Sequence, residues 1–195
     1  MHDTLLEVLS RDVRLTVEQS ALITSLWKPQ ELAKNECFHR AGTVTTRGGF
    51  VVHGCLRSYE VDAEGAETTL EFAPERSFVG DIGSAVSDRP SPYTVEAIEP
   101  STLLTIDFAS FNHMLEAIPA MQTGYRRGLQ RRQTAQQRRI TSSLSASAEA
   151  RYADFVAAQP ALAARVPQHM LASYLGITPE TLSRIRRRGT PRRRS

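Results

Sequence analysis

The 195-residue sequence contains only two cysteines, Cys37 and Cys55, and only one tryptophan. Two thiols are too few for a disulfide framework or a four-thiolate metal site, and a reducing compartment would leave both free. No apolar run reaches the roughly 18 residues that a membrane-spanning helix needs. The first residues mix acidic with apolar side chains and lack the basic-then-apolar order of a secretory signal. The sequence therefore predicts a cytoplasmic protein without a membrane partner.

Metal-ligating and catalytic constellations are also missing. The histidines are scattered, and the close His-x-His pair with a downstream carboxylate that a cupin enzyme needs is absent. We therefore expect no metal, no cofactor, no catalytic residues and no enzymatic activity. The alternative function is a small-molecule-binding or cupin-like enzymatic β-roll with a basic tail.

Acidic residues are scarce in the C-terminal third of the chain. The formal net charge is +3, but residues 126–195 hold 15 arginines against Glu149, Asp154 and Glu180, whereas residues 1–125 have a net charge of −9. Such an asymmetry indicates a polyanionic partner, and the arginine fork suits phosphates and base edges. We expect double-stranded DNA as the partner; a solvated basic surface and nonspecific nucleic-acid packaging are the alternatives.

The N-terminal part combines one helix with short β-type runs. Residues 16–27 carry apolar side chains at helical spacing and end before Pro29; these side chains are Val17, Ala21, Leu22, Leu26 and Trp27. Strands are expected at 36–40, 50–61, 66–72, 93–98 and 102–106, with turns at 41–42, 48–49 and 62–65. This pattern predicts a small antiparallel roll or barrel.

A helical region follows the roll. Residues 108–118 predict a short helix ended near Pro119, and a long helix is expected from about Ala120 to Leu144. Its positions 121, 125, 129, 133, 136, 140 and 144 form one narrow stripe, which favours pairing of two copies over packing on the chain's own roll. The serine-rich segment 142–147 predicts a hinge, in which Ser145 or Ser147 can cap the next helix. The expected domains are 1–118, 119–144 and 145–195.

Residues 168–187 carry the most specific pattern, that of two helices crossing at a tight turn. Ala172 provides a small contact residue, Gly176 begins the turn, and Thr178 caps the second helix ahead of Pro179. The side chains expected to hold the two helices together are Leu171, Leu175, Ile177, Leu182 and Ile185. This spacing predicts a helix-turn-helix.

The other face of the second helix is polar, and its side chains match base edges and phosphates in a major groove. We predict that DNA is contacted by Thr178, Glu180, Thr181, Ser183, Arg184, Arg187 and Arg188. The alternative is a plain helical hairpin whose Glu180 and Arg184, four residues apart, form a surface salt bridge.

The glycine-punctuated roll, the long helix, the serine-rich hinge and the run VPQHMLASYLGITPETLSRIRR together resemble the Crp/Fnr family of bacterial transcription regulators over about residues 15–188. The resemblance implies an α+β fold: an N-terminal antiparallel jelly roll of the cyclic-nucleotide-binding type, a dimerisation helix and a C-terminal helix-turn-helix. It implies a homodimer that reads a palindromic operator, with RNA polymerase as a further partner. It also implies base contacts by Glu180, Ser183 and Arg184.

The sequence departs from the family pattern at the effector site. Cyclic-nucleotide binders of the family hold the phosphate with Gly-Glu followed about ten residues later by Arg-Ser, because the cyclic phosphate needs a cationic fork. Here Gly80-Asp81 is followed by Ser91-Pro92, with Arg89 two residues too early. We therefore expect no cAMP binding. The roll either binds an unidentified small-molecule effector, with Gly80, Asp81, Arg89 and Ser91 as the candidate pocket, or only supports dimerisation.

Two further family features are absent from the sequence. The four cysteines of the Fnr iron-sulfur cluster are reduced to two, which we expect to be core residues rather than a thiol switch. Only residues 189–195 follow the recognition helix, too few for a β-hairpin wing. The tail Arg192-Arg193-Arg194 is a candidate phosphate clamp in its place.

Overall fold

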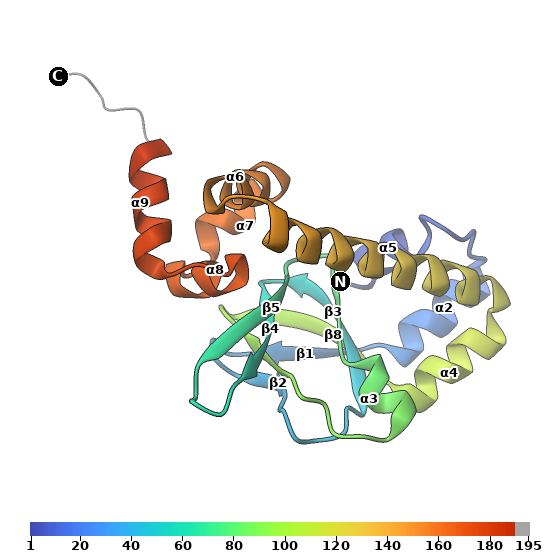
Figure 1. Ribbon diagram of the computed structural model, residues 1–195. Helices are drawn as coiled ribbons and strands as arrows, with labels where there is room; N and C mark the ends of the chain where they lie inside the picture. The colour runs from blue at the N-terminus through green and yellow to red at the C-terminus, as the bar shows by residue number, and fades with distance from the viewer. Residues whose placement is uncertain (190–195) are drawn as a thin grey trace.

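The computed structural model describes residues 1–189 and has two antiparallel four-stranded sheets followed by helices (Figure 1). One sheet has the order β1-β8-β3-β6, with bounds Lys28–Leu32, Ser101–Asp107, Arg47–His53 and Phe78–Val79. The other has the order β2-β7-β4-β5, with bounds Cys37–His39, Thr94–Ala97, Leu56–Val61 and Glu67–Ala73. The predicted α+β fold with an antiparallel roll is confirmed.

The roll encloses its own apolar core. Side chains from both sheets meet there because alternate residues of each strand face inward. The largest of these buried side chains are Leu32, Phe38, Val51, Leu56 and Leu103. Strands β1 and β6 and the short helix α3 (Ile82–Ser87) have no counterpart in the sequence prediction.

Two glycine predictions are wrong. The expected strand 50–61 is two strands, β3 and β4, separated at Gly54, which has a φ of +89°. A Cβ at Gly54 would lie 2.3 Å from Ser101 Oγ, so no side chain fits there. The expected turn at 48–49 lies inside β3 instead, where a Cβ on Gly49 would come within 3.0 Å of Leu103 and Val79 side-chain atoms. Gly49 is therefore a site of close packing rather than a turn residue.

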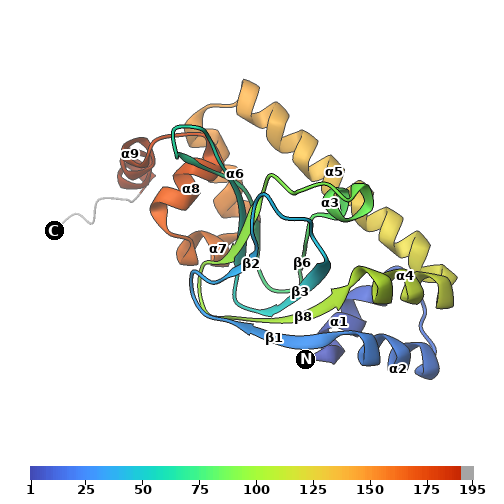
Figure 2. The same cartoon turned by 90° about the horizontal axis from the view of Figure 1, so that it is seen from below.

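Helices α1 (His2–Leu9) and α2 (Val17–Leu26) cover one end of the roll (Figure 2). Helix α2 begins with a capping box between Thr16 and Gln19. Its buried side is centred on Ile23, which is fully buried, whereas Val17 is 82% exposed. Ala21 is exposed as well, so the predicted apolar stripe of this helix is wrong at its first two positions, because tertiary packing selected a different side of the helix.

Helix α4 (Phe108–Ala117) leads into α5 (Pro119–Ser145), the long helix that runs along the flank of the roll in Figures 1 and 2. The side chains of the predicted stripe on α5 lie in two different environments, one buried and one exposed to solvent. Met121 is buried and Tyr125 lies edge-on to Phe111 with ring centroids 5.1 Å apart, whereas Ile140 and Leu144 are 61% and 84% exposed. Only the first part of the stripe packs on the protein's own roll.

Four helices complete the described chain: α6 (Ala148–Ala158), α7 (Pro160–Arg165), α8 (Gln168–Leu175) and α9 (Pro179–Gly189). Only Ala146 and Ser147 separate α5 from α6, and Ser147 caps α6 by accepting a hydrogen bond from the Ala150 amide. None of the helices in residues 1–189 is long and apolar enough to cross a membrane.

Candidate nucleic-acid interface

Helices α8 and α9 form the predicted helix-turn-helix. Gly176 has a φ of +65°, the left-handed conformation that ends α8 and starts the turn. The Ile177 amide then donates to the Ala172 carbonyl at 3.0 Å. Leu171, Ala172 and Leu182 are fully buried between the helices, so the side chains predicted to hold the motif together do face one another.

The start of α9 is fixed by local hydrogen bonds. Thr178 Oγ1 accepts from the Thr181 amide at 3.2 Å, and Gln168 Nε2 donates to the Pro179 carbonyl at 3.1 Å. Glu180 lies in the first turn, where its own backbone N–H and the Thr178 side chain lower the pKa of its carboxyl. The carboxylate is therefore ionised at neutral pH and available as an acceptor.

The predicted DNA-contacting residues share the outer face of α9. Thr178, Glu180, Arg184, Arg187 and Arg188 are exposed, while Thr181 and Ser183 are half-buried at the edge of the same face. Among residues 1–189 no ion pair joins Glu180 to Arg184, so the surface salt bridge of the alternative hairpin interpretation is not formed. Figure 1 shows α9 at the outer end of the molecule, with α8 between it and the roll. The face is therefore open to a large partner.

Arg186 has a different role from its neighbours. Its Nε donates to the Tyr152 hydroxyl at 3.2 Å, and its guanidinium also donates to the Ala163 carbonyl. These bonds tie α9 to α6 and α7 and hold the exposed face in place. This role of Arg186 was not predicted from the sequence, although the spacing of four residues from the buried Leu182 places Arg186 on the inner side of the helix.

This arrangement suits a DNA major groove. An exposed carboxylate can accept from cytosine N4, an arginine can bridge guanine O6 and N7, and the flanking arginines can contact phosphates. The candidate tail Arg192-Arg193-Arg194 lies outside the described residues.

The four candidate effector residues do not gather around one cavity. The Asp81 carboxylate accepts from the Ser84 amide at 3.1 Å and caps α3, and Ser84 Oγ donates to the Arg89 carbonyl. The Arg89 side chain is exposed, and the buried Ser91 hydroxyl accepts from the Tyr93 amide at 3.2 Å. Of the four, only Gly80 lines the cavity described next.

A cavity of about 630 Å³ lies between the roll and α5. Its wall is rich in aromatic and aliphatic side chains, including Phe78, Val79, Phe111, Leu129 and Tyr174. Three of the five arginines on the wall are each paired with a carboxylate, whereas Arg11 and Arg139 form no ion pair among residues 1–189. These pairs are Arg76 with Glu7, Arg131 with Asp12, and Arg132 with Glu71. The cavity therefore has a mainly apolar wall and keeps positive charge at Arg11 and Arg139.

The described part of the chain, residues 1–189, has no group of three or more His, Cys, Asp or Glu side chains that could hold a metal ion. Cys37 is half-buried in β2, while Cys55 is fully buried in the segment between β3 and β4. Burial raises the pKa of the Cys55 thiol to about 12. Cys55 packs against the C-terminal helices rather than inside the roll, which the sequence did not indicate.

The sequence of the roll is similar to that of known protein domains. A family model for the cyclic nucleotide-binding domain matches residues 29–117. Over 75 residues, or 38% of this chain, the sequence is 33% identical to the potassium channel KOR2 of Oryza sativa subsp. japonica. The matched segment is 10% of that channel, so the chain spans only a small part of its curated relative.

Solved structures match the chain over most of its length. The c-di-GMP-responsive global regulator CLP of Xanthomonas campestris aligns with a TM-score of 0.71 and 14% identity, covering 89% of this chain and 91% of that one. A transcriptional regulator of the Crp/Fnr family from Eubacterium rectale aligns with a TM-score of 0.67 and 21% identity, covering 89% and 83% of the two chains. At these sequence identities, the similarity establishes a shared fold.

The roll is thus a cyclic nucleotide-binding-type domain, joined through a long helix to a helix-turn-helix. The chain as a whole has the fold of the Crp/Fnr-family transcriptional regulators, and the predicted resemblance is confirmed.

Proposed function

We propose that this protein is a sequence-specific DNA-binding transcription regulator that acts as a homodimer on a palindromic operator. The observation that carries the proposal is the outer face of α9, where Glu180, Ser183 and Arg184 can reach base edges while Leu182 and Ile185 hold the opposite side. The exposed Arg187 and Arg188 would contact phosphates. Contact with RNA polymerase, which the family resemblance implies, stays a prediction.

The exposed part of α5 supports the homodimer. Leu129, Ile140 and Leu144 are 40%, 61% and 84% exposed, and their spacing of eleven and four residues places them on one face of the helix. The same face carries the uncharged Gln133. An exposed apolar stripe without charge on a long helix suits pairing with a second copy of itself.

The cavity between the roll and α5 supports an effector of mainly apolar character. Asp81 and Arg89 do not line this cavity, since Asp81 caps α3 and Arg89 faces solvent. A volume of about 630 Å³ is within the range that small-molecule sites occupy. We therefore propose a hydrophobic or aromatic effector in place of cAMP.

Selection of duplexes from a random pool by the full-length protein tests the proposed function. We expect a two-fold symmetric motif whose half-site centres are about 34 Å apart, one helical turn of DNA. Recovery of unrelated sequences with a steep salt dependence would instead support nonspecific nucleic-acid packaging. A ligand-induced thermal shift without any effect on DNA would support the small-molecule-binding roll.

A further inference from the structure

The free edge of the second sheet is covered by α8. Strand β5 is the last strand of the order β2-β7-β4-β5, so its outward backbone groups have no strand partner. The Ser173 hydroxyl of α8 accepts from the Thr69 amide at 2.9 Å and donates to the Glu67 carbonyl at 2.9 Å. The Ser173 side chain therefore satisfies two of the outward backbone groups of β5 that have no neighbouring strand.

Arg139 of α5 makes a second connection at the same edge. Its guanidinium donates to the carbonyls of Leu70 and Thr69 in β5, and to the Tyr174 carbonyl in α8 at 2.9 Å. It also lies over the Tyr174 ring, 4.1 Å from the centroid. A single side chain thus joins the long helix, the roll and the helix-turn-helix.

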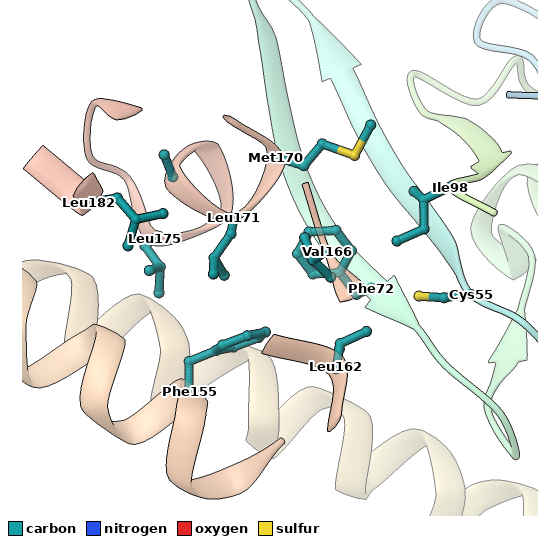
Figure 3. Packing of buried hydrophobic residues seen from close by; sticks show 11 residues of the cluster. Cys55, Phe72, Ile98, Phe155, Leu162, Val166, Met170, Leu171, Leu175 and Leu182 are labelled. Carbon is teal, nitrogen blue, oxygen red and sulfur yellow. The ribbon is translucent and has the colours of Figure 1, made fainter. Parts of the chain in front are cut away.

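The surface beneath these hydrogen bonds is apolar (Figure 3). The roll contributes Cys55, Phe72 and Ile98, which pack against side chains of α6, α7 and α8 and of the turn before α8. The Phe72 ring lies 5.2 Å from that of Tyr174. At the rim, Arg165 of α7 pairs with Glu75 and Glu99 of the roll.

This interface has the features of a contact that can open. The roll supplies only three buried apolar residues to it, and the Arg165 and Glu75 side chains are about a third exposed. The helix-turn-helix retains buried contacts of its own, Leu171, Leu175 and Leu182 among them, that do not need the roll. Interfaces between domains permit relative motion by default unless they are large and hydrophobic, and the apolar contribution of the roll to this one is small.

We propose that Arg139 and Ser173 are positioning residues that dock the helix-turn-helix on the β5 edge and so fix α9 relative to α5. The consequence for DNA rests on the function proposed above. Docking leaves the outer face of α9 exposed, so the docked form is competent to read DNA. In a dimer paired through α5, docking would fix the distance between the two copies of α9 before DNA binds. This would reduce the conformational entropy lost on DNA binding.

The same residues connect docking to the effector cavity. Phe72, Arg139 and Tyr174 all line the cavity between the roll and α5. The cavity wall therefore includes both sides of the docking contact, Phe72 of the roll and Tyr174 of α8. Ligand binding and docking should therefore change together, because a ligand shifts an equilibrium when it interacts differently with the two states.

Cys55 provides a reporter of docking that does not depend on DNA. It is fully buried beneath the helix-turn-helix, beside Glu75, Glu99 and Arg165, so a thiol reagent reaches it only when the interface opens. We would measure its alkylation rate in full-length protein carrying Cys37→Ser. Melting curves on the same samples separate opening of the interface from global unfolding.

Ser173→Ala and Arg139→Gln should each raise the Cys55 alkylation rate by about tenfold or more, the equivalent of losing one or two hydrogen bonds. Ser173→Thr, which keeps the hydroxyl, should restore slow labelling. Arg138→Gln is the matched control, because Arg138 is the neighbouring arginine on α5 and is exposed. Unchanged labelling in both test variants would overturn the proposal.

The DNA readout is the preference for half-site spacing. The Ser173→Ala and Arg139→Gln variants should lose discrimination between palindromes with correct and altered spacing, while contacts within each half-site persist. Retention of full spacing discrimination despite fast Cys55 labelling would remove the positioning role. If the wild-type protein selects no DNA sequence, the proposed function fails, but the Cys55 measurement still decides whether the helix-turn-helix docks as described.

Discussion

The outer face of α9 and the segment from Gly80 to Ser91 are both rich in polar side chains, yet they use them differently. Glu180 and Arg184 on α9 are exposed and form no ion pair with each other. In the second region, Asp81 caps α3, Ser84 bonds to the Arg89 carbonyl, and Ser91 bonds to the Tyr93 amide. A binding surface needs accessible polar groups close together, and the outer face of α9 presents several of them, whereas the Gly80–Ser91 segment uses Asp81, Ser84 and Ser91 in internal hydrogen bonds.

The largest effect on stability should follow from deleting a buried side chain that holds α9 against α8. Leu182→Ala deletes a fully buried side chain between α8 and α9, which should cost about 2 to 5 kcal/mol of stability. Val17→Ala is the control, because Val17 is 82% exposed and should change stability by less than about 0.5 kcal/mol. Urea unfolding measures both. Equal effects would show that α9 does not depend on this packing.

Removing a reading side chain should have a smaller and more specific effect. Arg184→Ala should reduce discrimination at one base pair of each half-site by about 1 to 3 kcal/mol. Arg188→Ala should weaken binding to all sequences about equally, since a phosphate contact carries no base information. Titration of a panel of single-base operator variants distinguishes the two. The same uniform loss in both variants would argue against base reading by Arg184.

The cap of α9 should contribute about 1 kcal/mol, the usual loss when an N-cap threonine becomes alanine. Thr178→Ala also removes one of the hydrogen bonds that lower the pKa of Glu180 below its reference of 4.5. A lowered carboxyl pKa adds stability that is present above the unfolded-state pKa and is lost as the pH falls through the folded-state pKa. Stability of the variant should therefore depend less steeply on pH in this acidic range, which urea unfolding at several pH values would show. An unaltered pH dependence would mean that Thr178 does not act on Glu180.

The smallest effect should come from the Gly80–Ser91 segment. Arg89→Ala should leave operator affinity unchanged, and cAMP should shift neither the melting temperature nor the DNA affinity of the wild-type protein. A cAMP-dependent gain in affinity that Arg89→Ala abolishes would show that the segment rearranges into a phosphate site after all.

Most of the helix-turn-helix could be predicted because its determinants are local. Gly176, Thr178 and Pro179 specify a turn and a helix start through their own backbone preferences and short-range hydrogen bonds. The strands around Gly42 and Gly65 followed from similar turn signals. The two-residue strand β6 and the six-residue helix α3 carry too few residues for a periodic pattern, so they became visible only in the folded chain.

The contacts between distant segments were outside the reach of sequence patterns. Arg138 and Arg139 are adjacent and chemically identical, but Arg139 binds the β5 carbonyls while Arg138 faces solvent. Cys55 looked like a strand residue of the roll core and lies instead under the C-terminal helices. Which side of α5 meets the roll depends on the packing of the whole molecule, and periodicity alone does not encode it.

The central claim is that the outer face of α9 contacts DNA bases. Its most direct test is photocrosslinking from position 183 on that face, with position 113 on α4 as a surface control. The account predicts crosslinks to bases at symmetric positions in both halves of the selected operator from position 183, and none from position 113. Crosslinks from position 183 that fall on the protein's own roll, with operator present as well as absent, would contradict it.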